Sequence, residues 1–120
     1  MNNISLSEHF SLAEFECPCC HRVMLCQNLF FRIVLLRNTL GKPIYITSGY
    51  RCPKYNSRVK GDSNSYHMKG LAVDIVVHDI PLPELYTTAK ELGFTGIGIY
   101  PQKNFLHLDV RPGAYTEWRG

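Results

Sequence analysis

Two short segments, residues 71–77 (LAVDIVV) and 105–110 (FLHLDV), alternate apolar side chains with ionisable ones. Successive side chains of a β-strand point to opposite faces, so each segment has one wholly apolar face. Asp74 lies on the other face of the first strand, and His107 and Asp109 share the other face of the second. A buried carboxylate is costly unless a cation, a hydrogen-bond network or a metal ion compensates it. If both strands belong to one sheet, we expect Asp74 and His107 to converge on a shared cleft.

The remaining patterns predict an α+β domain, with a small antiparallel sheet and helices packed on one side of it. At 120 residues the chain is expected to form a single domain, residues 1–120. Further strands are expected within residues 43–50 and 96–100, and helices within residues 11–15, 28–40, 53–61 and 81–93. Asn28 is the expected N-cap of the longest helix and Gly41 its C-terminal stop, and Pro53 suits a first helical turn.

Charge and hydropathy exclude several classes of partner. The formal net charge is +3 and no run of basic residues resembles a nucleic-acid arm, so no nucleic-acid partner is expected. No apolar run approaches the roughly 20 residues needed to span a bilayer, so no membrane span is expected. Residues 1–15 lack the basic and apolar regions of a signal peptide. We therefore expect a protein that is synthesised in the cytoplasm without a signal peptide, and that is a monomer.

The cysteines are unevenly distributed. The chain has five, which cannot all pair internally, and four of them cluster in residues 17–26 (CPCCHRVMLC). Without a secretion signal, free thiols or metal ligation are favoured over a disulfide framework. Three interpretations stay open: a structural zinc ion at the C-x-x-C of Cys17 and Cys20, a disulfide from Cys52 to the cluster, and plain buried thiols.

A candidate metal site contains the two strand residues and a nearby histidine. His67 precedes Asp74 by seven positions and can reach the same cleft. With His107, these residues supply two imidazole nitrogens and one carboxylate oxygen. Such a set, with a fourth position for water, is typical of catalytic zinc, whereas magnesium and calcium prefer oxygen ligands. The alternative without a metal is a capping histidine, a salt-bridged aspartate and a hydrogen-bonded histidine. These residues alone leave both interpretations open.

Other aromatic and histidine residues carry weaker signals. Four aromatic residues are candidates for a groove wall, although aromatic residues are more often packing residues: Tyr50, Tyr66, Tyr100 and Trp118. Three histidines are expected to be surface or capping residues: His9, His21 and His78.

Two longer stretches, residues 48–75 (SGYRCPKYNSRVKGDSNSYHMKGLAVDI) and 96–111 (GIGIYPQKNFLHLDVR), carry a family resemblance. They resemble the zinc D-alanyl-D-alanine carboxypeptidase family of peptidoglycan peptidases, and its small YcbK-like branch in particular. Phage endolysin peptidases and the hedgehog signalling domain are related to this family. Residues 10–20 (FSLAEFECPCC) fit the same branch. The pattern S-x-H-x-x-G-x-A-x-D is intact as Ser65, His67, Gly70, Ala72 and Asp74.

The resemblance implies roles for four residues. Zinc in the family is held by the histidine and aspartate of this pattern and by a later strand histidine. The ligands implied here are His67, Asp74 and His107. Arg51 matches an arginine that lies beside the zinc and either binds substrate or stabilises charge on the scissile carbonyl.

The general base is the point at which the chain departs from part of the family. Many members have Asp or Glu three residues before the last zinc histidine, and here that residue is Asn104. Asp109 is a nearby carboxylate on the strand face of His107, and it is the candidate catalytic residue for proton transfer. Two other roles stay open for Asp109, which are orienting His107 and pairing with Arg111.

The resemblance implies a zinc metallopeptidase that hydrolyses amide bonds in peptidoglycan stem peptides or cross-links. The missing signal peptide fits a phage-derived lysis enzyme that acts on the cell wall after release. Two alternatives stay open. A related scaffold can retain zinc yet act as a non-catalytic binding module, and a cytoplasmic dipeptidase would cleave free D-Ala-D-Ala.

Overall fold

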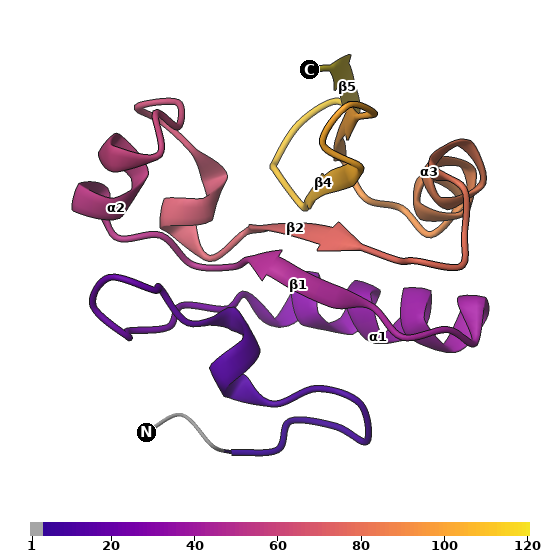
Figure 1. Cartoon of the computed structure of the whole chain (residues 1–120), viewed down its shortest axis with the longest axis horizontal. Coiled ribbons are helices and arrows are strands. Elements are labelled where there is room, and N and C mark those ends of the chain that lie inside the picture. Colours follow the sequence, from indigo (N-terminus) through magenta and orange to yellow (C-terminus); the bar gives the residue numbers. More distant parts are fainter. Residues whose placement is uncertain (1–3) are drawn as a thin grey trace.

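A five-stranded sheet organises the chain, with strand order β1-β2-β4-β3-β5. The computed structural model describes residues 4–120 (Figure 1). The strands are β1 (Tyr45–Ser48), β2 (Ala72–Val76), β3 (Gly96–Tyr100), β4 (Phe105–Asp109) and β5 (Thr116–Arg119). The first four pair antiparallel, and β5 pairs parallel to β3. The predicted α+β class is confirmed. The expectation of a purely antiparallel sheet is corrected, because β5 was not predicted.

Residues 4–120 also form five helical segments, two of which precede β1. They are the 3-10 helices η1 (Leu12–Phe15) and η2 (Tyr66–Lys69), and the α-helices α1 (Gln27–Leu40), α2 (Pro53–Arg58) and α3 (Leu82–Glu91). Gly41 ends α1 in the left-handed conformation, at φ 64°, as its sequence position predicted. The N-cap of α1 is Cys26, so the prediction of Asn28 is wrong. The short turn η2 was not predicted, because a single turn has too few residues for helical periodicity.

The apolar face of the sheet and two helices form the hydrophobic core. Helices α1 and α3 contribute Leu29, Ile33, Leu36, Leu85 and Ala89 to it. The sheet contributes Val73, Ile75, Ile97, Leu106 and Leu108. Helix α2 and η2 contribute no apolar side chain to this cluster, among the residues described. In Figure 1, α2 lies at the opposite side of the molecule from α3. Within residues 4–120, no helix is both long and apolar enough to cross a membrane.

The N-terminal segment packs beneath the loop that follows β1. The backbone N–H of Tyr50 donates to the Phe15 carbonyl at 2.9 Å. A Cβ atom at Gly49 would lie 2.6 Å from the same carbonyl oxygen, so only glycine allows this approach. The ring of Phe15 in turn packs against Phe10 and Phe30, with ring centroids 6.0 and 6.1 Å away. This packing fixes the position of residues 49–52.

The core arrangement predicts a contrast between two residues of α1. Replacing the fully buried Ile33 by alanine should lower the free energy of unfolding by about 2–5 kcal/mol, since it leaves a cavity in the core. The control is Phe31→Ala, because that side chain is 59% exposed, and its effect should stay within about 0.5 kcal/mol. Urea denaturation followed by circular dichroism measures both. Equal losses in the two variants would contradict the packing of α1 described above.

Candidate metal centre

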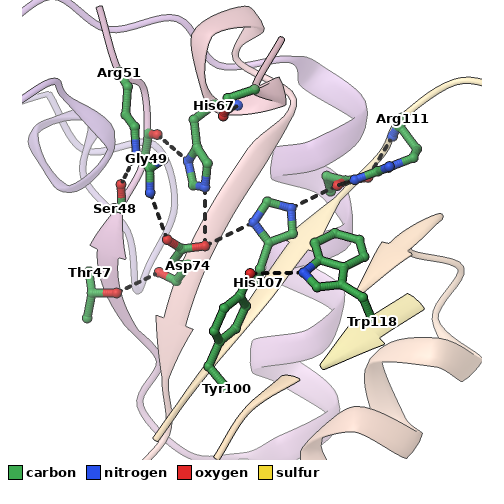
Figure 2. Close-up of polar contacts among 12 residues, drawn as sticks. Thr47, Ser48, Gly49, Arg51, His67, Asp74, Tyr100, His107, Arg111 and Trp118 are labelled. Carbon is green, nitrogen blue, oxygen red and sulfur yellow. Dashed lines mark hydrogen bonds and ion pairs between the residues drawn. The ribbon is translucent and has the colours of Figure 1, made fainter. Parts of the chain in front are cut away.

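Three side chains from η2, β2 and β4 meet at one end of the cleft. In the register of β2 against β4, Asp74 lies directly opposite His107. His67 comes from η2 and is buried, with 2% of its surface exposed. Figure 2 shows both imidazole rings directed at the Asp74 carboxylate. One ligand atom of each residue lies within 4.8 Å of the other two. The structure therefore brings together the three ligands that the sequence implied.

The spacing of these atoms suits a tetrahedral zinc ion. Asp74 Oδ1 lies 3.2 Å from His67 Nε2 and 3.0 Å from His107 Nδ1. Zinc ligands at the usual distance of about 2.0–2.1 Å are about 3.3 Å apart in a tetrahedral shell. The observed separations are close to that value. Two imidazoles and one carboxylate also match the donor set of catalytic zinc.

Hydrogen bonds fix which nitrogen of each ring is free to bind a metal. His67 Nδ1 lies 2.8 Å from the Gly49 carbonyl oxygen, which can only accept, so this nitrogen carries the proton. His107 Nε2 lies 2.8 Å from Asp109 Oδ2 and donates to that carboxylate. The lone pairs of His67 Nε2 and His107 Nδ1 therefore both face Asp74 Oδ1. Three acceptor atoms this close together require a cation among them.

The contacts within this group also shift the pKa values of two of its members. Burial would lower the pKa of His107, but its contacts with Asp109 and Asp74 outweigh burial and raise it. Burial would likewise raise the pKa of Asp74, but its contacts with His107 and His67 hold it well below its usual range. The centre thus favours a charged carboxylate and a bound cation.

Arg51 holds the second oxygen of the Asp74 carboxylate. Its Nη2 donates to Asp74 Oδ2 at 3.1 Å, and its Nε donates to Ser48 Oγ at 3.0 Å. Its Nη1 donates to Oδ1 of the buried Asn56 at 3.3 Å. These contacts fix Asp74 with Oδ1 directed at the two histidines. Arg51 also lines the cleft, where it was expected to act on substrate, and that role stays a prediction.

Asp109 is fully buried behind His107 and forms an ion pair with Arg111. Its Oδ2 accepts from Arg111 Nη2 at 2.7 Å, and its Oδ1 accepts from Arg111 Nε at 2.9 Å. Burial would raise the pKa of Asp109, but hydrogen bonds with His107 and Arg111 lower it to about 2. A Cβ atom at Gly96 would collide with this carboxylate, so glycine makes room for it. These contacts match the orienting and ion-pair roles, and the proton-transfer role stays a prediction.

An open cleft of about 820 Å³ lies over the three ligands. Five basic residues line it: Arg51, Lys60, Lys69, Lys103 and Arg111. Its acidic lining residues are Asp62 and Asp74, so the cleft carries an excess of positive charge. The three lysines were not predicted, because lysines scattered along a chain form no pattern that indicates a shared surface.

Aromatic side chains form part of the cleft wall. Of the four candidates, Tyr66, Tyr100 and Trp118 line the cleft, and Tyr50 is not among its lining residues. Trp118 Nε1 donates to the Tyr100 hydroxyl at 2.9 Å, and the Trp118 ring centroid lies 5.1 Å from that of His107 (Figure 2). The strand β5, which sequence periodicity missed, therefore supplies a wall of the site. Asn104 lies in the turn before β4 at φ 53° and is not among the lining residues.

The buried Asp109 predicts an effect on metal affinity. Asp109→Asn should weaken zinc binding by about 10–100-fold, because the neutral amide no longer holds the His107 ring through a charged acceptor. Competition with a chelator of known affinity measures the change. The matched control is Asp79→Asn at an exposed position, which should bind zinc as the unmodified protein does. Unchanged affinity in Asp109→Asn would show that this carboxylate does not support the centre.

Comparisons with known proteins agree with this geometry. Residues 8–109 match the peptidase M15 family. The chain is 34% identical over 101 residues to the probable peptidoglycan L,D-endopeptidase MepK of Haemophilus influenzae, over 78% of this chain and 53% of that protein. It is 34% identical over 95 residues to the peptidoglycan L,D-endopeptidase MepK of Escherichia coli K12, over 73% of this chain and 52% of that protein.

A third relative is the zinc D-Ala-D-Ala carboxypeptidase of Streptomyces albus G. The two chains are 37% identical over 92 residues, which cover 73% of this chain and 35% of that protein. The chain spans about half the length of the two MepK relatives. The family match extends from before η1 to the end of β4 and includes all three candidate ligands. The chain therefore belongs to the peptidase M15 family.

Proposed function

We propose that this chain is a zinc metallopeptidase that hydrolyses amide bonds in the stem peptides or cross-links of peptidoglycan. One observation carries the proposal: two imidazole nitrogens lie 3.2 and 3.0 Å from one carboxylate oxygen, in an open cleft. Membership of the peptidase M15 family supports the same activity. The names of the relatives, which include L,D-endopeptidases and a D-Ala-D-Ala carboxypeptidase, support peptidoglycan as the substrate.

Some residues of the centre would bind the metal, and others orient the residues that bind it. His67 Nε2, His107 Nδ1 and Asp74 Oδ1 would hold the zinc. A zinc ion held there would supply Lewis-acid chemistry, which polarises an amide carbonyl and lowers the pKa of water so that the water is a nucleophile near neutral pH. Arg51 orients Asp74, and its place in the cleft wall allows its positive charge to stabilise the developing oxyanion. Asp109 Oδ2 accepts a hydrogen bond from the Nε2–H of His107. This contact holds the proton on Nε2 and leaves the Nδ1 lone pair free for the metal.

The charge of the cleft supports an anionic peptide as substrate. Stem peptides of peptidoglycan carry free carboxylates, and the lining has five basic residues against two acidic ones. Lys60, Lys69 and Lys103 lie around the cleft without direct contact with the three ligands, so they are suited to binding substrate carboxylates. The aromatic wall of Tyr100 and Trp118 offers a flat surface for the peptide or the adjoining sugar.

A specific observation keeps a second candidate function open. Apart from the ligand Asp74, Asp62 is the one acidic residue among those described in the cleft lining, and Asp109 is fully buried. Asn104 occupies the position at which many family members carry an acid. A zinc-retaining module that binds peptidoglycan without cleaving it would need no accessible base. The peptidase stays our proposal, because the centre keeps an open side toward the cleft.

Digestion of purified muropeptides tests the proposal. We expect new free amines that appear with zinc-loaded protein, disappear with a chelator and return when zinc is restored. Mass spectrometry of the products identifies the bond that is cut. His67→Ala should abolish hydrolysis because it removes a ligand, whereas the control His78→Ala, at an exposed position, should retain it. Tight zinc binding without any product would overturn the peptidase and favour the binding module.

Asp109 is further tested by separating metal affinity from turnover. If this carboxylate only orients His107, Asp109→Asn should regain activity once zinc is raised to saturate it. The measurement is kcat at saturating zinc, with the zinc content of the same sample determined. A loss of about 10²–10⁴-fold that persists in fully loaded protein would instead assign proton transfer to Asp109.

A further inference from the structure

A second group of potential metal ligands lies outside the cleft. Cys17 and Cys20 belong to the loop after η1, and Cys52 is the N-cap residue of α2. Their three Sγ atoms all lie within 4.8 Å of one another, although Cys52 is 35 residues from Cys17. The remaining cysteines, Cys19 and Cys26, do not belong to this group. The fold therefore selects three of five cysteines and brings their sulfur atoms together.

One of these sulfur atoms accepts a backbone N–H from the segment that carries another of the three cysteines. The N–H of Cys52 donates to Cys17 Sγ at 3.4 Å, so the loop that carries Cys17 contacts the start of α2 through this sulfur. The thiolate is the form of cysteine that binds metals, and it is also the better acceptor for such an N–H.

Cys52 receives the same kind of support from its own helix. The N–H of Tyr55, in the first turn of α2, donates to Cys52 Sγ at 3.4 Å. Cys52 thus occupies the position where a capping side chain accepts a backbone hydrogen bond. The sulfur atoms of Cys17 and Cys52 therefore each accept a backbone N–H.

The loop that carries Cys17 and Cys20 is closed on itself. The N–H of His21 donates to the Cys17 carbonyl at 2.8 Å, and the N–H of Cys17 donates to the Arg22 carbonyl at 2.8 Å. His21 adopts φ 60°, a left-handed conformation that costs energy for a residue other than glycine. This tight turn holds both sulfur atoms on the side of Cys52.

We propose that Cys17, Cys20 and Cys52 bind a second zinc ion, which is structural. Thiolates are preferred ligands of zinc in such sites, and a C-x-x-C pair is a usual half of them. Sulfur ligands at about 2.3 Å from zinc lie about 3.8 Å apart in a tetrahedral shell, and the three Sγ atoms, all within 4.8 Å of one another, are compatible with that spacing. Structural zinc usually has four protein ligands; here the exposed Cys20 leaves the fourth position on the solvent side, where a water molecule would complete the shell.

The second ion would fix the position of residues 49–52, which contact the first metal centre. It would join the N-terminal loop to residue 52, which directly follows Arg51. The same loop, residues 49–52, carries the Gly49 carbonyl that orients His67. Holding this loop in place holds both Arg51 and the Gly49 carbonyl, so the ion would act as a positioning element for the first centre.

Zinc content per chain tests the proposal directly. Reduced protein is loaded with excess zinc, desalted and analysed for metal and protein. We expect two zinc ions in the unmodified chain, one in Cys52→Ser and one in His107→Ala. The matched control Cys26→Ser should retain two, because Cys26 lies outside the group and serine is a good N-cap for α1.

Cobalt substitution identifies the ligands without depending on peptidase activity. Cobalt bound by thiolates gives sulfur-to-metal charge-transfer absorption, which should be present in the unmodified protein and in His107→Ala. It should be absent from Cys52→Ser. This absorption depends only on the cysteine ligands, so it would be present in His107→Ala even if the first centre were assigned wrongly. The experiment therefore tests the second site independently of the proposed peptidase.

Other outcomes would overturn the second site. One zinc ion in the unmodified chain, removed by His107→Ala, would leave no metal at the cysteines. The same conclusion would follow if all three thiols reacted with a thiol reagent equally fast before and after a chelator. A mass lower by two hydrogens in protein isolated without reductant would assign a disulfide to the cluster instead.

Discussion

The pairing of β2 with β4 is the constraint on which the centre depends. Its register sets Asp74 directly opposite His107 and keeps Val73 and Leu108 on the core face. A slip of one residue would move every side chain of a strand to the other face, with the carboxylate in the core and the apolar residues in the cleft. The burial of the apolar face therefore stabilises the same arrangement that brings the ligands together. Burial of the apolar strand faces thus drives both the folding of the sheet and the assembly of the site.

Around this pairing, each ligand is held by a further contact. The Gly49 carbonyl holds His67, Arg51 holds Asp74, and Asp109 holds His107. These supports are themselves fixed, because Gly49 packs on the Phe15 backbone and Asp109 is paired with Arg111. Such supports set the tautomer and direction of a ligand, which raises metal affinity without adding a metal bond. The centre is thus preorganised by hydrogen bonds that reach from the N-terminal segment to the end of β4.

The two faces of the sheet differ in polarity and in what covers them. One side is covered by α1 and α3 and is almost wholly apolar, whereas the other carries the ligands and the basic cleft. The glycine at position 96 leaves room for the Asp109 carboxylate on the second side. The cysteine group lies at the junction of the N-terminal loop with α2, and α2 contributes no apolar side chain to the core cluster among the residues described. A metal ion at this junction would supply the cross-link that hydrophobic packing supplies elsewhere.

Alternation and helical periodicity determined much of this protein without any structure. They predicted the faces of β2 and β4, the helices α1 and α3, and the convergence of Asp74 with His107, because each depends on local periodicity and apolar burial. The spacing of His67 from Asp74 added the third candidate ligand, and the family resemblance added Arg51. Only the tertiary structure decided the parallel β5 with Trp118, the ring nitrogens that face Asp74, and the meeting of Cys52 with Cys17 and Cys20. These features depend on contacts between residues far apart in the chain, and local periodicity carries no record of such distances.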